Sequence, residues 1–280
     1  MTLKNFIPFA LLMSSSLVVN ADGLLCKSLF YKPYKATEFI IEISGKKESA
    51  AFLLAAHDNL VTTADTLIVK QILKQIIVSG ADSLSDEQLK LVYKFRQNSS
   101  FLRSIFQTSE KNHASPDDFA KFVKDFGHLK DMLLINETAE ASSTAKSILK
   151  KYKKIDFANL LEDAKPASKK SVEKYFHFLL NNTKLIMAKD ILTVDEVHTV
   201  RKNLRDVLRY MQISNEVKQM PDTLQIDFLK KINSKLGVIC DEYAAQIIRN
   251  ELSKGTVISF PESLRPRVEY FLANYQVITL

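Results

Sequence analysis

The chain has little glycine, little proline and no tryptophan. Its 280 residues include 6 Gly and 7 Pro. Both residue types punctuate chains that are rich in tight turns, so their scarcity disfavours a β-sandwich or barrel and favours long helices. The absence of Trp excludes a Trp-based aromatic cage for a cationic ligand. The sequence therefore predicts an all-α fold, and its 46% of hydrophobic residues suffice for a substantial core.

Long apolar runs are also missing beyond the N-terminus. Residues 7–19 form an apolar stretch that follows Lys4 and has the length of a signal-peptide core, too short for a confident membrane span. We therefore expect a signal peptide over residues 1–21, cleaved after Ala21, and a periplasmic or secreted protein without an integral membrane span. The alternative is an N-terminal helix buried in the fold. Cleavage removes one Lys and no acid, so the formal net charge changes from +7 to +7 − 1 = +6.

Cysteine is nearly absent. Only Cys26 and Cys240 occur, and both remain after the expected cleavage. An oxidising compartment permits one disulfide between them, but the sequence leaves open whether they meet in space. Two thiols without nearby Cys or His partners make a poor zinc site. We predict no metal and no other cofactor.

The rest of the chain is divided into four parts by its pattern. Residues 22–47 form an N-terminal extension, in which "EFIIEISGKK" is either a short strand or a helix entry. Apolar residues at three- and four-residue spacing then predict a first helical bundle over residues 48–162 and a second over residues 171–280. A Lys-, Ala- and Ser-rich linker around Pro166, residues 163–170, separates them.

The two predicted bundles carry a weak internal repeat. Leu84 corresponds to Leu192, and Asp118-Phe119 corresponds to Asp227-Phe228. A Gly followed four residues later by Asp occurs at Gly127 and again at Gly237, with Asp131 and Asp241 as the paired acids. The order of these matches predicts two related antiparallel bundles packed together.

The predicted helix over residues 194–211 gathers an unusual number of basic side chains. At about 100° per residue, they share one sector about 100° wide. Apolar side chains fill a second sector, the expected core seam, and Thr199, Asn203, Asp206 and Tyr210 fill a third that we expect to face solvent. Like charges at i,i+4 repel, and a bound anion would relieve that repulsion. The basic sector consists of His198, Arg201, Lys202, Arg205 and Arg209.

These residues carry a resemblance to a known family. The segment "VHTVRKNLRDVLRYM", followed by "LKKINSKLGVICDEYA", resembles the CHAD family, the conserved-histidine α-helical domain. His198, Arg201 and Arg205 fit its first motif, and Leu236-Gly237 with Asp241 fit its second. The resemblance implies a pair of related helical bundles and a non-catalytic groove that binds inorganic polyphosphate.

The expected polyanion site draws on both halves of the repeat. From the second half it takes the basic sector, and from the first half we expect Lys90, Lys94, Arg103 and Lys130. Such a site would bind through phosphate contacts and counterion release.

Other functions have less support in the sequence. The alternative to anion binding is a structural or protein-interaction module in which acids such as Glu242 or Glu173 pair with the basic sector. Enzyme signatures such as HExxH, a glycine-rich phosphate loop or GxSxG are absent, so we predict no catalysis. The Lys-rich run over residues 146–154 has a single Tyr, which gives little stacking capacity for nucleic acid.

Overall fold

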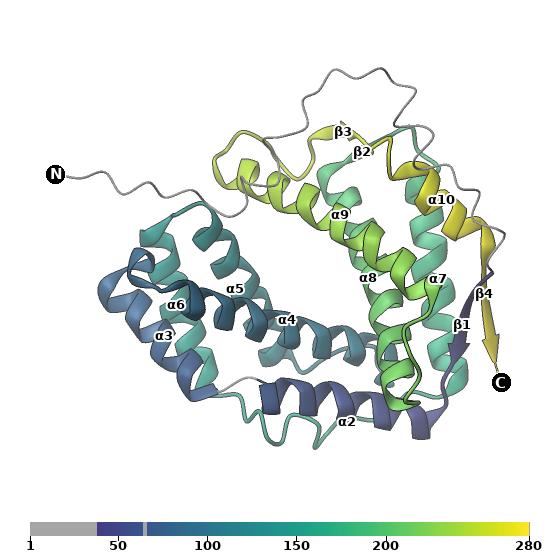
Figure 1. Ribbon diagram of the computed structural model, residues 1–280, viewed down its shortest axis with the longest axis horizontal. Coiled ribbons are helices and arrows are strands. Elements are labelled where there is room, and N and C mark those ends of the chain that lie inside the picture. Colours follow the sequence, from purple (N-terminus) through teal and green to yellow (C-terminus); the bar gives the residue numbers. More distant parts are fainter. Residues whose placement is uncertain (1–37, 64–65, 280) are drawn as a thin grey trace. The chain divides into compact units, whose positions relative to one another are not determined.

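The computed structural model describes residues 38–63 and 66–279 (Figure 1). The predicted signal peptide, most of the predicted N-terminal extension and Cys26 lie outside the described residues. The described part is mostly helical, as predicted, with a few short strands. Its helices are α2 (Lys46–Thr63), α3 (Thr66–Ser79), α4 (Asp86–Ser109), α5 (Asp117–Leu134), α6 (Thr138–Tyr152), α7 (Lys169–Met187), α8 (Val194–Val217), α9 (Leu224–Ile248) and α10 (Arg265–Asn274), with a 3₁₀ turn at Ala81–Ser83.

Two helices begin at matching capping boxes. The Ser85 hydroxyl accepts a hydrogen bond from the Gln88 backbone at the start of α4, and the Gln88 side chain accepts one from the Ser85 backbone. Thr193 and Glu196 form the same reciprocal pair at the start of α8. Each box satisfies two of the amide groups that a helix N-terminus leaves without intrahelical partners.

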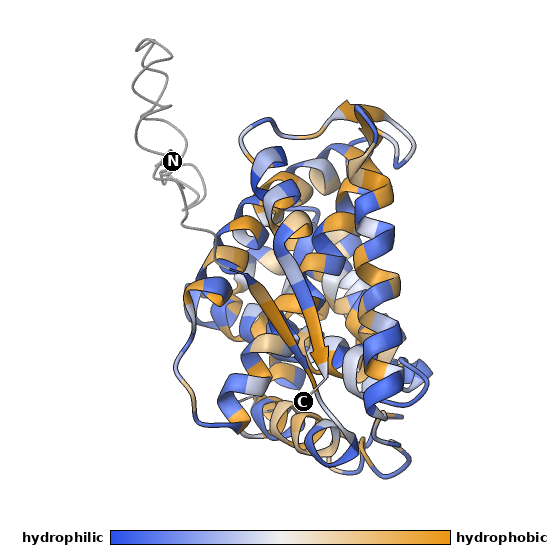
Figure 2. Cartoon of the chain, turned by 90° about the vertical axis from the view of Figure 1, so that its right-hand side faces the viewer, coloured by the Kyte–Doolittle hydropathy of each residue, from blue (hydrophilic) through white to orange (hydrophobic). Residues whose placement is uncertain are grey.

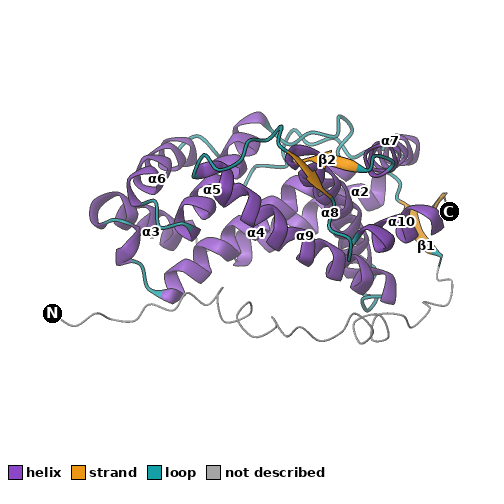
Figure 3. Cartoon of the chain, turned by 90° about the horizontal axis from the view of Figure 1, so that it is seen from above, coloured by secondary structure: helices purple, strands orange, loops and turns teal. Residues whose placement is uncertain are grey.

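The strands are short and lie beside the helices (Figure 3). β1 (Phe39–Ile43) pairs in parallel with β4 (Tyr275–Thr279), so that Ile41 faces Val277 in register. β2 (Ile191–Thr193) pairs antiparallel with β3 (Val257–Ser259) immediately before α8. The segment "EFIIEISGKK" is therefore a strand followed by the start of α2. Figure 2 shows β1 and β4 side by side, and along β1 buried residues alternate with partly exposed ones.

Helix α8 is surrounded by other elements. It packs against α9, α4, α7 and α2. Helices α2 and α4 belong to the predicted first bundle and α8 to the predicted second. Their buried apolar residues form one core that is continuous across the two predicted bundles. The predicted linker is held in place as well, since the Ala167 amide donates to the Ser109 carbonyl at 2.8 Å and Ala167 is fully buried. The division into two bundles stays a prediction.

Candidate functional site

The apolar seam predicted for α8 is confirmed. Val197, Val200, Leu204 and Val207 are completely buried. Their burial fixes the rotation of α8, and this rotation sets where its basic side chains point.

The third sector of α8 was expected to face solvent, and this expectation is wrong. Asp206 and Tyr210 are buried, with 4% and 1% of their surfaces exposed. The Tyr210 hydroxyl donates to the Glu42 carbonyl and accepts from the Ser44 amide at the end of β1. Asn203 donates to the Thr183 hydroxyl of α7. Asn203, Asp206 and Tyr210 are polar because they bind neighbouring elements, whereas the Thr199 hydroxyl donates to the Asp195 carbonyl of α8 itself.

A cavity of about 220 Å³ lies between α8 and α9 and is the candidate functional site. Helix α4 and helix α5 each contribute one side chain to its wall, and the segment before β3 contributes another. This volume is below the range of about 300–1,000 Å³ typical of drug-sized ligands, so it suits a compact group. Its lining consists of Arg96, Asp131, Val194, Asp195, His198, Arg201, Lys202, Cys240, Asp241, Tyr243, Ala244, Ile247 and Lys254.

Gly237 makes room for the guanidinium group of Arg201. A Cβ atom built at Gly237 would lie 3.3 Å from Arg201 Nη2, closer than side chains normally approach. Arg201 therefore lies directly against the backbone of α9. Gly127, the matching position in the predicted repeat, has nothing within 4 Å of such a Cβ atom. Of these two glycines, Gly237 therefore has a side chain packed closely against it, and Gly127 does not.

Lys130 connects the two aspartates that the repeat pairs. Its Nζ atom lies 2.8 Å from Asp241 Oδ1 and 3.2 Å from Asp131 Oδ1. Lys130 itself is 8% exposed. It was expected to bind a polyanion, but here it neutralises two carboxylates in the wall of the cavity.

Among the described residues, the other basic side chains that line the cavity form no ion pair with an acid. In the part of the chain that the structure describes, no acid lies within ion-pair distance of Arg96, Arg103, Arg201 or Lys202. Arg205 lies 3.6 Å from Asp206, measured from Nε to Oδ1, yet its buried Nε has no hydrogen-bond partner. Neither Glu242 nor Glu173 forms an ion pair with these groups in the part of the chain that the structure describes. A buried donor without a partner is costly, and an anion would satisfy it.

Burial and mutual repulsion lower the pKa values of these cations. Burial is the main cause for Arg96, Lys202 and Arg205. Neighbouring cations add to it: Arg201 acts on Arg96, and Arg205 acts on Lys202. The same effects lower the pKa of His198 to about 4, with burial first and Lys202, Arg201 and Arg205 next. His198 is therefore neutral at pH 7. The positive charge of the side chains around the cavity exceeds the negative charge of the acids there.

Arg209 belongs to the contact between α8 and α4. Its Nη1 atom donates to the Ser100 carbonyl, to the Ser100 hydroxyl at 3.0 Å and to the Ser104 hydroxyl at 2.9 Å. Ser104 in turn donates to Asp206 at 2.6 Å. Seven residues of helix place Arg209 about 10 Å along the axis from Lys202, beyond the cavity. Arg209 thus positions α8 and does not line the cavity.

The residues expected from α4 divide into two groups. Lys90 and Lys94 are exposed and do not line the cavity. Arg103 is half-buried and close enough to lower the pKa values of Lys202 and Arg205. The sequence analysis missed Arg96, which the angular pattern could have identified. Arg96 and Arg103 are seven residues apart and so lie about 20° apart around α4, whereas Lys94 lies about 160° from Arg96.

Cys240 has a buried thiol at the cavity wall. Burial raises its pKa to about 11, so the thiol stays protonated at neutral pH. Its predicted pairing with Cys26 involves a residue outside the described part of the chain. Among the described residues, no group of three or more His, Cys, Asp or Glu side chains is placed to hold a metal ion.

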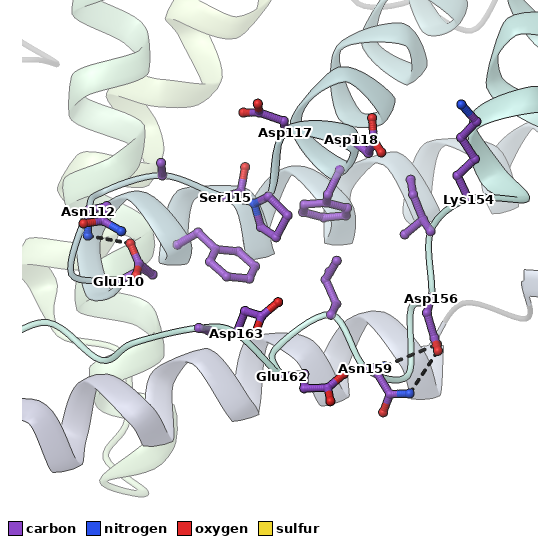
Figure 4. Close-up of a pocket in the computed structure, with 17 residues that line it drawn as sticks. Glu110, Asn112, Ser115, Asp117, Asp118, Lys154, Asp156, Asn159, Glu162 and Asp163 are labelled. Carbon is purple, nitrogen blue, oxygen red and sulfur yellow. Dashed lines mark hydrogen bonds between the residues drawn. The ribbon is translucent and has the colours of Figure 1, made fainter.

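A second, larger cavity has the opposite charge. It measures about 560 Å³ and lies between the start of α5 and the segment after α6. Figure 4 shows Asp117 and Asp118 on the α5 side and Asp156, Glu162 and Asp163 on the facing segment. Its acids repel anions, so of the two described cavities the one beside α8 suits an anionic ligand.

Within the described residues, no helix combines the length and the apolar character that crossing a bilayer requires. Comparison of the chain with protein-family models, with curated proteins and with solved structures finds no match.

Proposed function

We propose that the protein binds inorganic polyphosphate or a similar polyanion, without catalysis, along the facing sides of α8 and α4. The observation that carries the proposal is a set of cations that form no ion pair with any described carboxylate: Arg96, Arg103, Arg201 and Lys202, together with the unsatisfied Nε of Arg205. Uncompensated charge in a partly buried place costs free energy unless an opposite charge joins it. Guanidinium groups suit phosphate because their planar fork donates two hydrogen bonds.

The spacing of these cations supports an extended anion over a single ion. Arg96 lines the cavity, and Arg103 lies two helical turns further along α4, about 10 Å away. On α8, Arg201 and Lys202 line the cavity and Arg205 follows one turn later. A chain of phosphates could place one group in the cavity and the next beside Arg205 and Arg103.

The proposal includes membership of the CHAD family and its duplicated plan. Helices α4 and α8 have equal lengths of 24 residues and begin with matching capping boxes. Lys130 places Asp131 and Asp241, which occupy matching positions, beside one another. These features support an internal repeat of two antiparallel bundles. The proposed location is periplasmic or secreted, after cleavage following Ala21.

Binding of tripolyphosphate and long-chain polyphosphate over a series of salt concentrations tests the function. We expect the wild-type protein to bind both and to lose affinity steeply with salt. An Arg201→Ala/Arg205→Ala variant should bind far more weakly. The matched control is Lys150→Ala/Lys153→Ala, which removes one exposed cation of α6, another directly after its end and the same charge. Equal binding by wild type and by the arginine variant at low salt would reject the proposal in favour of a structural or protein-interaction module.

A further inference from the structure

His198 lies in the wall of the α8–α9 cavity. Within the described residues, its ring forms no hydrogen bond and no ion pair. A neutral imidazole carries one donor and one acceptor, whereas the protonated ring carries two donors. The protonation state of His198 therefore changes what the cavity offers to an anion.

Charged groups surround His198 from every side of the cavity. Helix α8 contributes Arg201, Lys202 and Arg205 as cations and Asp195 as an acid. Helix α4 contributes Arg96, and Lys254 lies in the segment before β3. Asp131 of α5 and Asp241 of α9 both pair with Lys130, while Cys240 and Tyr243 of α9 complete the wall.

We propose that His198 takes up a proton when an oxyanion enters this cavity, so that the cavity binds phosphate-type anions more tightly as the pH falls. The proposal rests on the anion-binding function above. In the empty cavity, burial and then Lys202, Arg201 and Arg205 keep the ring neutral at pH 7. An oxyanion offsets these three cations and accepts a hydrogen bond from the ring, and both effects favour the imidazolium form.

The linkage between proton and anion fixes the sign of the effect. If the bound anion raises the pKa of His198, then protonation raises the affinity for the anion by the same free energy. Affinity should rise by up to about tenfold for each unit by which the pH falls below the pKa of the bound state, down to that of the empty state. Each binding event should take up as much as one proton.

Sulfate is the probe that tests this coupling, because it does not itself titrate between about pH 5 and about pH 8, where histidine does. Two measurements follow. NMR titration of the imidazole of the wild-type protein gives the pKa of His198 with and without saturating sulfate. Calorimetry in two buffers with different heats of ionisation gives the number of protons taken up on binding. We expect a higher pKa in the sulfate-bound protein and proton uptake that increases as the pH falls.

Two variants locate the effect. His198→Gln should bind sulfate with little dependence on pH and without the proton uptake. His177→Gln is the matched control, because His177 is exposed on α7 and does not line the cavity. It should behave as wild type. Persistence of the proton uptake in His198→Gln would overturn the proposal.

The outcomes separate this proposal from the function on which it rests. Binding of sulfate with an unchanged pKa of His198 rejects the coupling and leaves anion binding intact. Failure of both sulfate and tripolyphosphate to bind across this pH range rejects both. Because the NMR measurement uses the wild-type protein, it decides the question even if His198→Gln does not fold.

Discussion

Lys130 of α5 lies 2.8 Å from Asp241 of α9, measured from Nζ to Oδ1, and this contact joins the two halves of the proposed repeat. Asp131 completes the group at 3.2 Å. Lys130, which we expected to bind the polyanion, thus forms ion pairs within the protein. Asp131 and Asp241 would otherwise present two uncompensated negative charges to an entering anion.

Lys130→Met should destabilise the protein. Lys130 is nearly buried and its partners are partly exposed. The loss of stability should therefore lie between that for a surface ion pair and that for a fully buried one. We expect the free energy of unfolding to fall by about 1–3 kcal/mol, measured by urea denaturation. Lys90→Met is the matched control, since Lys90 is exposed on α4, and it should change stability by less than about 0.5 kcal/mol. Similar values for both variants would show that the Lys130 contacts contribute little.

Gly237→Ala should weaken anion binding, whereas Gly127→Ala should leave it unchanged. Both glycines lie inside helices, where Ala is favoured by about 1 kcal/mol. At Gly127 nothing opposes that gain, so Gly127→Ala should raise stability and leave tripolyphosphate affinity unchanged. At Gly237 the new methyl group would lie 3.3 Å from Arg201 Nη2 and would displace the guanidinium group.

We therefore expect Gly237→Ala to gain less stability than Gly127→Ala and to lose several-fold in affinity for tripolyphosphate. Calorimetric titration and urea denaturation of both variants provide the measurements. Unchanged affinity in Gly237→Ala would mean that the position of Arg201 over α9 does not matter for binding.

The helical periodicity predicted the apolar seam of α8 but not the role of its polar sector. Val197 and Leu204 are buried as their spacing requires. Asp206 and Tyr210 have the polarity of surface residues, yet their partners are Ser104 of α4 and the backbone of β1. Those partners are about 100 residues or more away in the chain. A pattern within one helix cannot reveal that another element supplies the hydrogen bonds.

The sequence predicted only part of the candidate site, and the reason is related. The spacing of His198, Arg201 and Lys202 placed them on one side of α8, and all three line the same cavity. The sequence analysis expected Lys90 of the first half at the site, whereas the cavity is lined by Arg96, almost two turns later on α4. The repeat compares residue types along the sequence, but which side chain of α4 reaches the cavity depends on how α4 crosses α8. That crossing is a property of tertiary packing.

Asp195→Asn should strengthen anion binding. Asp195 is exposed, lines the cavity and forms no ion pair with any described residue. Its charge therefore acts against an anion, and its removal breaks no salt bridge of the described structure. Across a partly solvated cavity, removal of one negative charge should raise the affinity for tripolyphosphate about threefold to tenfold at low salt. Salt should reduce the gain. Asp227→Asn, an exposed change on α9 away from the cavity lining, should leave affinity within about twofold. A loss of affinity in Asp195→Asn would contradict electrostatic binding.

The stability of the empty protein should depend on pH through His198. Its pKa falls from about 6.5 in a solvated chain to about 4 in the folded state, chiefly because of burial. The unfolded chain therefore binds a proton more readily, and stability must decrease as the pH falls between these values. His198 thus contributes stability that is fully present above about pH 6.5 and is lost progressively toward about pH 4.

Urea denaturation in a buffer without multivalent anions, at about pH 7 and about pH 5, measures this contribution. Wild type should lose about 1–2 kcal/mol more than His198→Gln over this interval. Saturating sulfate should reduce the difference, because a bound oxyanion favours the protonated ring and so removes the reason for the loss. If wild type and His198→Gln lose the same stability without sulfate, the folded protein does not disfavour protonation of His198. The proposed coupling between proton and anion would then fail, because it requires that the empty folded protein disfavours protonation of His198.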